Sequence, residues 1–367
     1  MPRTRRATGQ TGAVLRISVV LAVLLAATPV AAAGLARDDT LVFAFTGDTL
    51  THLNVNAAAR RHGSPYDFQP LFEPVRHLIA GADFAICHME VPLSPDNSVI
   101  SSFPRFSGPR EMADALAYAG FDACSTASNH TIDQGVRGAL ATRQVLEEAG
   151  LRQSGIRNSV LEIWTDPVYD VEGVKVAHLA ATYWYNGLRP PAGQEWISSV
   201  LDVDDLLHRA RRAKVMGVDL VVVSMHCCVE YQRTPTSRQL EVSHALIESP
   251  DIDLVVTHHS HVVGPVERVG DEFVLHGLGN FLSGQRFSPQ VQNGVIAMVR
   301  ARRVDGVWRF DQVEVVPTQV TTRSVIVPAP EGSDSWRRTM ETVNLMGAEV
   351  QPFRGHLRRG ARLDLWD

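Results

Sequence analysis

The order of apolar and polar segments limits the folds that this chain can adopt. Four times, an amphipathic stretch leads through an Asp into a short apolar run that ends in polar side chains. Helical periodicity followed by a near-continuous apolar run is typical of helix–strand units whose strands are buried on both faces. We therefore predict an α/β fold with largely parallel strands. The four units are residues 68–94, 108–135, 203–231 and 237–263, and a strand without a helix of its own precedes them at 38–50.

Residues able to bind a metal or to move a proton follow each of these strands. Because ligands of α/β sheets bind at the carboxyl ends of the strands, these side chains are expected to share one site. On a solvated surface they would instead be scattered along the helices. The candidates are Asp48; His88 and Glu90; Asn129, His130 and Asp133; His226 and Glu230; and His258, His259 and His261.

The first candidates also have purely structural explanations. Asp48, in a Gly-Asp pair, could cap a helix or form a turn. Glu90 stands two residues after His88, so their side chains share one face of an extended strand. A carboxylate and an imidazole on one face suit a transition metal, and the alternative is a surface salt bridge.

The segment "STASNHTIDQG" places an amide next to an imidazole, so both enter one site only from a turn or loop. Asn129 offers a neutral carbonyl ligand, His130 can act as a general acid, and Asp133 can orient that histidine. The alternative is an Asx-turn that caps the following helix.

Histidines close the last two units. His226 ends a strand in "MHCCVEY", where a lone His is more often a core residue. In "THHSH", His259 and His261 form an H-x-H pair, and on an extended segment their rings share one face. This pattern favours metal binding. We expect His258 to face the other way and to support the site.

The spacing of the cysteines fits neither a disulfide framework nor a zinc ribbon. Cys87 and Cys124 can pair if their strands are neighbours, and buried free thiols are the alternative. Cys227 and Cys228 are adjacent, and adjacent cysteines rarely bond without strain, so we expect thiols there. Such a thiol could also bind zinc.

Residues 1–36 have the layout of a secretory signal peptide, with an Arg-rich start, an apolar stretch and an A-x-A pattern at its end. We predict cleavage and a secreted or extracytoplasmic location, with an uncleaved membrane anchor as the alternative. Residues 39–330 are predicted to form one catalytic domain, and residues 331–367 a C-terminal helix and tail. The net charge of −5 argues against a nucleic-acid partner.

Antiparallel strands are predicted in the second half of the chain. Turns at Glu172-Gly173 and at Asp305-Gly306 each predict a hairpin.

Six short segments in order resemble the CapA family of capsule and poly-γ-glutamate synthesis proteins, which is similar to the calcineurin-like metallophosphoesterases. The segments are "TGD", "HMEVPLS", "SNHTIDQG", "MHCCVEY", "THHSHVVGPVE" and "LGNF". The resemblance implies a four-layer αββα sandwich with one or two divalent transition metal ions (Mn, Fe or Zn) at the strand ends. It further implies that His130 is the catalytic histidine and that the metal ligands are Asp48, Glu90, Asn129, His226, His259 and His261.

The chain departs from the family at three places. His88 stands where the family has Asn, so it is either an additional ligand or a replacement for an Asn hydrogen bond. Cys227 and Cys228 stand where the family has Trp and Gly, which changes the wall of the site. The first strand lacks the D-x-H of the phosphoesterases, and His52 could compensate.

Together these features predict metal-dependent hydrolysis of a phosphoester, or of an amide or ester in an anionic envelope polymer. His130 would protonate the leaving group, and Asp133 or Glu230 would orient a neighbouring histidine. The expected partners are the anionic polymer and membrane-bound polymer synthase components. The alternative is a non-catalytic surface scaffold or polymer-binding component, in which the metal is a structural staple.

Overall fold

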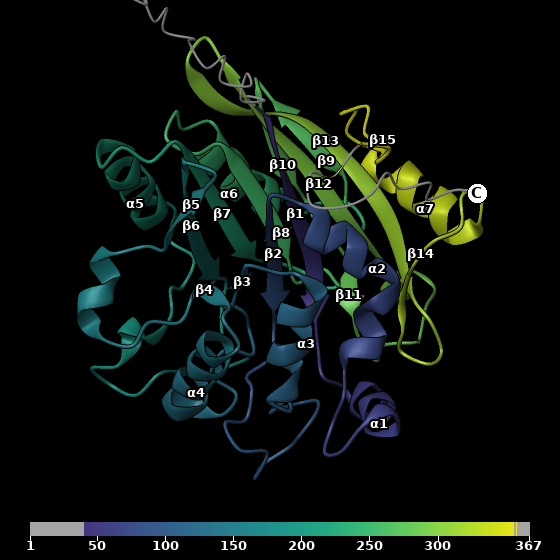
Figure 1. Ribbon diagram of the computed structural model, residues 1–367. Helices are drawn as coiled ribbons and strands as arrows, with labels where there is room; N and C mark the ends of the chain where they lie inside the picture. Colours follow the sequence, from purple (N-terminus) through teal and green to yellow (C-terminus); the bar gives the residue numbers. More distant parts are fainter. Residues whose placement is uncertain (1–39, 356, 358–367) are drawn as a thin grey trace, which may run out of the picture. The chain divides into compact units, whose positions relative to one another are not determined.

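Two β-sheets pack face to face in the computed structural model, which describes residues 40–355 and 357 (Figure 1). Helices cover the outer face of each sheet, so the chain forms a four-layer αββα sandwich. This arrangement confirms the predicted fold class. The predicted signal peptide or anchor, residues 1–36, lies outside the described residues. Within the described part, no helix is long and apolar enough to cross a membrane.

The first sheet has nine strands in the described part, with β1 near its centre. Strands β2, β3 and β4 extend in parallel on one side of β1, and β12, β13 and β14 extend in antiparallel pairs on the other. The predicted turn at Asp305-Gly306 joins β12 to β13, and short β11 runs parallel to the end of β1. The bounds are β1 Thr40–Thr49, β2 Phe84–Met89, β3 Ala123–Ser125, β4 Arg152–Ser154, β11 Asn280–Leu282, β12 Asn293–Val304, β13 Val307–Val320, β14 Ile326–Pro328 and β15 Gln351–Pro352.

The second sheet has six strands in the order β5-β6-β7-β8-β10-β9. Its inner strands are parallel and the two edge strands antiparallel, and β5 and β6 form the hairpin predicted at Glu172-Gly173. Every residue of β7 and β8 is buried, as expected for apolar strands covered on both faces. The bounds are β5 Val168–Val171, β6 Val174–Thr182, β7 Leu220–His226, β8 Leu254–His258, β9 Val266–Val269 and β10 Glu272–Leu275.

Three of the helices, α5, α6 and α7, begin with a side chain that caps the first turn. The side chains of Asp202 and Thr236 accept hydrogen bonds from the third backbone N–H of α5 and α6, and Ser333 does the same for α7. Helices α1–α4 cover the first sheet and α5 and α6 the second. The bounds are α1 Leu53–His62, α2 Gln69–Gly81, α3 Glu111–Ala119, α4 Gly135–Glu148, α5 Val203–Val215, α6 Ser237–Ile247 and α7 Asp334–Val343, with short 3-10 helices at Val160–Trp164, Glu195–Ile197 and Gln290–Gln292.

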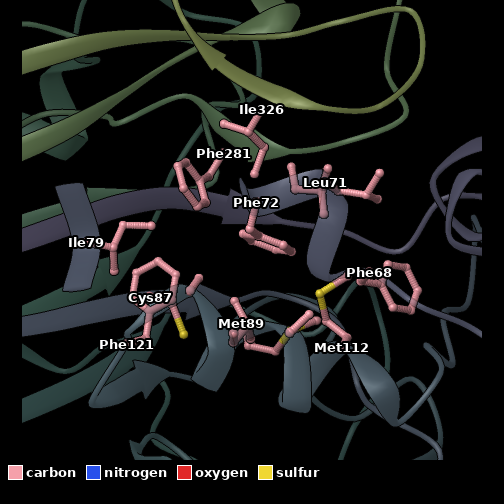
Figure 2. Close-up of a cluster of buried hydrophobic side chains, with 14 of the residues drawn as sticks. Phe68, Leu71, Phe72, Ile79, Cys87, Met89, Met112, Phe121, Phe281 and Ile326 are labelled. Carbon is pink, nitrogen blue, oxygen red and sulfur yellow. The ribbon is translucent and has the colours of Figure 1, made fainter. Parts of the chain in front are cut away.

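Three large apolar clusters separate the layers. Figure 2 shows the first, in which Phe72 of α2 packs between the first sheet and its helices near Phe281 of β11. The second lies between the two sheets and includes Phe43 of β1 and Val222 of β7. Burying an aromatic or branched side chain of this kind contributes about 1.5–3 kcal/mol, so these layers hold the strand ends in place.

The cysteines form two bonds. Cys87 and Cys124 stand opposite each other on β2 and β3 and form a disulfide, as neighbouring strands would allow. Cys227 and Cys228 are also bonded to each other, so the expectation of two thiols is wrong. Since none of the described cysteines is free, the alternative of a thiol ligand falls away.

Candidate metal centre

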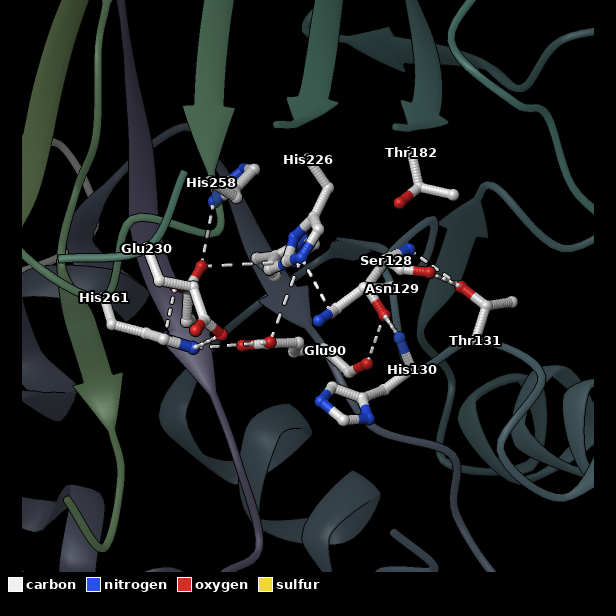
Figure 3. A network of polar contacts seen from close by, with 12 residues as sticks. Glu90, Ser128, Asn129, His130, Thr131, Thr182, His226, Glu230, His258 and His261 are labelled. Atoms are coloured by element: carbon white, nitrogen blue, oxygen red, sulfur yellow. Dashed lines mark hydrogen bonds and ion pairs between the residues drawn. The ribbon is translucent and has the colours of Figure 1, made fainter. Parts of the chain in front are cut away.

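Polar side chains from strands of both sheets converge where these strands end (Figure 3). Asp48, His88, His226 and His258 stand at the ends of β1, β2, β7 and β8, and Asn129 lies on the turn after β3. Each is at most 4% exposed. The chain therefore brings the predicted strand-end residues together, while their roles as ligands remain predictions.

The end of β1 is shaped by a close backbone approach. A Cβ at Gly47 would lie only 1.9 Å from the carbonyl oxygen of Gly279, so a glycine is required there. The approach lets the backbone N–H of Asp48 donate to that oxygen at 2.9 Å. It fixes the direction in which the Asp48 carboxylate enters the site.

Asn280 orients His261, a role that the sequence reasoning did not assign. The Asn280 amide nitrogen donates to Gln285 and to the backbone oxygen of Val291, which leaves its Oδ1 facing His261 Nδ1 at 3.1 Å. The same Nδ1 lies 3.0 Å from Asp48 Oδ2. These acceptors hold a proton on Nδ1, so Nε2 is the nitrogen that would bind a metal once it has lost the proton that the raised pKa of His261 keeps on it. The segment "LGNF", whose Asn follows Gly277 and Gly279, was the sequence signal that could have pointed to this role.

His226 is held from both ring nitrogens. Its Nε2 lies 2.9 Å from Asn129 Oδ1, and its Nδ1 lies 3.0 Å from His88 Nε2. The amide nitrogen of Asn129 donates to Asn186, which turns the Asn129 oxygen toward His226. His88 therefore occupies the position of an orienting group for His226, one of the two roles predicted for it.

The ligand atoms fall into three sets among the described residues. Within each set, one atom from every residue lies within 4.8 Å of the others, and Asp48 and Glu90 each belong to two sets. The sets are Asp48, His88 and His258; Glu90, His226 and His259; and Asp48, Glu90 and His261. Because they share carboxylates, they form one continuous cluster.

Buried oxygens without donors indicate that this cluster fits a cation. Asp48 Oδ1 and both carboxylate oxygens of Glu90 are buried and have no hydrogen-bond partner. An uncompensated buried charge is costly, and a divalent ion would compensate it. Imidazole nitrogens combined with carboxylate and amide oxygens suit Mn, Fe or Zn better than Ca.

Burial shifts some pKa values of the cluster toward the neutral form, and contacts with charged neighbours shift others toward the charged form. Burial raises the pKa of Glu90 well above its usual value, and lowers that of His226 well below its usual value and that of His259 to about 4. Burial also opposes charge on Asp48 and His261, but it is outweighed by the contacts of Asp48 with His258 and His261 and of His261 with Glu90 and Asp48. The pKa of Asp48 is therefore lowered and that of His261 raised to about 9. Neutral His226 and His259 keep a lone pair for a metal.

Two expectations for "THHSH" are wrong. His258 does not face away: its Nδ1 lies 3.6 Å from Asp48 Oδ1, and its ring stacks on His88 with centroids 3.9 Å apart. His259 and His261 do not lie on an extended segment, because their φ angles are +86° and +55°. The chain turns at once after β8, so the two rings reach the site from a turn.

The predicted acid, His130, lies beside the cluster with its predicted partner. Its Nδ1 is 2.7 Å from Asp133 Oδ2, and that oxygen also accepts the backbone N–H of Phe106 at 2.7 Å. Ser128 holds the turn, since its hydroxyl donates to the backbone oxygen of Glu90 and accepts the N–H of His130. The arrangement leaves Nε2 of His130 as the atom available to a substrate.

Glu230 and His52 lie at the margin of the cluster. Glu230 has a side chain 42% exposed, with Oε1 3.7 Å from His261 Nε2. His52 belongs to none of the three ligand sets, so it does not compensate for the missing D-x-H. Its Nδ1 instead accepts the backbone N–H of Gly284.

The fold is a four-layer αββα sandwich of the metallophosphoesterase-like type, with a candidate metal centre at its strand ends. A solved structure named "Putative 5'-Nucleotidase from Staphylococcus aureus" matches with a TM-score of 0.50 at 17% identity, covering 82% of this chain and 58% of that one. The calcineurin-like phosphoesterase YfkN of Bacillus subtilis matches with a TM-score of 0.48 at 11% identity, covering 82% of this chain and 96% of that one.

The sequence places the chain more narrowly. The model of the family "Bacterial capsule synthesis protein PGA_cap" matches residues 42–285, and the chain belongs to this family. The capsule biosynthesis protein CapA of Bacillus anthracis is 26% identical over 68% of this chain and 61% of its own length. The PGA biosynthesis protein CapA of Bacillus subtilis (strain 168) is 24% identical over 82% of this chain and 76% of its own length. The chain thus spans less than two thirds of the first of these relatives.

Proposed function

We propose that this chain is an exported metal-dependent hydrolase that cleaves a phosphoester during the synthesis of an anionic capsule polymer. The observation that carries the proposal is the buried cluster of carboxylates and imidazoles beside the His130–Asp133 pair. A structural staple alone would not explain a histidine–carboxylate pair held next to the ligands. The names of the CapA relatives support the polymer, and residues 1–36 support export.

Asp48, Glu90, Asn129, His226, His259 and His261 would hold one or two divalent ions, with His88 and His258 against them. An ion bound there supplies a water of lowered pKa and polarises the scissile bond. Asn280 holds a proton on His261 Nδ1, so His261 would present Nε2 to an ion. Asn129 Oδ1 can only accept, so Nε2 of neutral His226 donates to it and Nδ1 accepts from His88 Nε2; an ion at Nε2 of His226 would replace that proton.

His130 would donate the proton that the leaving oxygen needs. A proton on its Nδ1 is held by the Asp133 carboxylate, which stabilises the charged imidazolium before transfer and keeps Nε2 directed outward. Glu230, exposed beside His261, is placed to contact substrate or to hold that ring. Membrane-bound polymer synthase components are the proposed partners.

Hydrolysis of phenyl, 4-nitrophenyl and bis(4-nitrophenyl) phosphate with added manganese tests this function. Wild-type protein should turn over at least one ester, and His130→Ala should lose most of its activity on phenyl phosphate, whose leaving oxygen needs a proton, while still binding metal. His62→Ala, at an exposed histidine at the end of α1, is the matched control. Manganese-loaded protein that cleaves none of these esters would contradict a phosphoesterase. Unimpaired polymer production by a His130→Ala strain would instead favour a non-catalytic scaffold.

A further inference from the structure

A second polar cavity lies apart from the metal ligands, at the edge where β4 and β6 approach. It has a volume of about 220 Å³ and contains no residue of the three ligand sets. Four guanidinium groups line it, against three carboxylates. The arginines are Arg143, Arg152, Arg157 and Arg209, and the carboxylates are Glu147, Glu162 and Asp166.

Two of these arginines are matched by carboxylates. Arg209, 3% exposed, pairs with Asp166 and Asp205 and donates to the Ser199 hydroxyl. Arg143 pairs with Glu147 and Glu162 on the other side of the cavity. These ion pairs hold the side chains in place, and they engage all three carboxylates that line the cavity.

Arg157 is not matched in this way. Its Nη1 donates to the backbone oxygen of Trp196 at 3.3 Å and its Nη2 to Ser199, but no carboxylate pairs with it among the described residues. A guanidinium has five N–H donors, so donors of Arg157 remain for a ligand. Burial, and next the charge of Arg209, lower the pKa of Arg157, as expected where positive charge is in excess.

Arg152 adds a second guanidinium without a carboxylate partner among the described residues that line the cavity. Its Nη1 donates to the backbone oxygen of Val168 at 3.0 Å, and its guanidinium lies 4.5 Å over the ring of Tyr169. These contacts fix its position without neutralising it. Two fixed guanidinium groups without carboxylate partners form a site for the oxygens of an anion.

We propose that this cavity binds an oxyanion group, a phosphate or a carboxylate, through Arg157 and Arg152. The site is separate from the metal centre, but a series of contacts links the two. Ser199 contacts Arg157, its backbone oxygen accepts the N–H of Thr182, and Thr182 pairs in register with His226. The cavity would therefore hold an anionic group without taking part in the chemistry at the centre.

Isothermal titration of the metal-loaded full chain tests the site, with inorganic phosphate in one arm and γ-linked tri-glutamate in the other. At least one ligand should bind wild-type protein saturably. Arg157→Gln should weaken that binding by about tenfold or more, or remove one site from the stoichiometry. Arg303→Gln, at an exposed arginine of the β12–β13 hairpin, should bind as wild type does. The ligand whose binding is weakened by Arg157→Gln shows whether the cavity binds phosphate or carboxylate.

Arg152→Gln, at an exposed position, gives the same test if Arg157→Gln does not fold. Phosphate bound only at the metal centre would be retained in both variants. The proposal is overturned if both variants bind both ligands as wild type does, or if wild-type protein binds neither. Failure of the wild-type protein to hydrolyse aryl phosphates, by contrast, would contradict the proposed function and leave the proposal for this site standing.

Discussion

The substitution Asp133→Asn tests the proposed proton donor, His130, independently of the proposed metal ligands. In the wild-type protein, Asp133 Oδ2 accepts both the Phe106 backbone N–H and the His130 ring, each at 2.7 Å, and the pair is buried. An Asn oxygen in the place of Oδ2 can still accept from both Phe106 and His130, but it carries no charge. The imidazolium would keep a neutral acceptor and lose the carboxylate that stabilises its charge, while the fold would keep its hydrogen bond.

The size of the effect follows from that one contact. Replacing a charged acceptor by a neutral one costs about 0.5–2 kcal/mol, so kcat should fall by roughly 2- to 30-fold. The loss should depend on the leaving group, because 4-nitrophenolate needs little protonation and phenolate needs much more. We therefore expect a large loss with phenyl phosphate and a small one with 4-nitrophenyl phosphate.

Steady-state kinetics on both esters with manganese measure this difference. Asp114→Asn, at an exposed position on α3, is the control and should leave both rates unchanged. Thermal unfolding should stay within a few degrees of wild type, because the Phe106 contact survives. Equal losses on the two esters, or no loss with phenyl phosphate, would refute the role of His130 as acid.

Three further predictions concern a disulfide, a partly buried carboxylate and a histidine beside the metal ligands. Replacing Cys87 and Cys124 together by Ala should lower the free energy of unfolding by up to about 4 kcal/mol, because the bond closes a loop across 37 residues; an unchanged urea midpoint would contradict the disulfide. Burial raises the pKa of Glu272 to about 7, so stability should decline as pH rises from about 4.5 to 7. Glu272→Gln should therefore stabilise by about 1 kcal/mol at pH 8, after allowance for partial exposure, and have no effect at pH 4 in thermal unfolding. His88→Ala should weaken manganese binding about 10- to 100-fold in titrations, whereas His88→Asn should retain most of the affinity; equal losses would argue that His88 is itself a ligand.

The sequence was sufficient for the features that depend on local pattern. Apolar runs after amphipathic stretches predicted the buried strands, and the hairpins at residues 172–173 and 305–306 followed from their turn residues. The convergence of Asp48 and Asn129 followed from strand ends, because parallel strands place their carboxyl ends on one edge of a sheet. His226 comes from the second sheet, so its contact with Asn129 depends on how the two sheets pack.

The remaining details depend on contacts between distant segments. The direction of His258 is set by stacking on His88, 170 positions earlier in the chain, and no periodicity reports that contact. The positive φ of His259 arises from a turn that a strand pattern does not encode. Asn280 acts on His261 only because β11 lies beside β1, a pairing between residues far apart in sequence.

Anomalous diffraction from crystals grown with manganese tests the central claim most directly. The claim is that the buried cluster holds catalytic metal. We predict at least one anomalous peak in contact with Glu90, with His261 and Asp48 on one side of that carboxylate or His226 and His259 on the other. Crystals of Glu90→Gln should show weaker peaks or none. Wild-type crystals without an anomalous peak between these residues would contradict the claim.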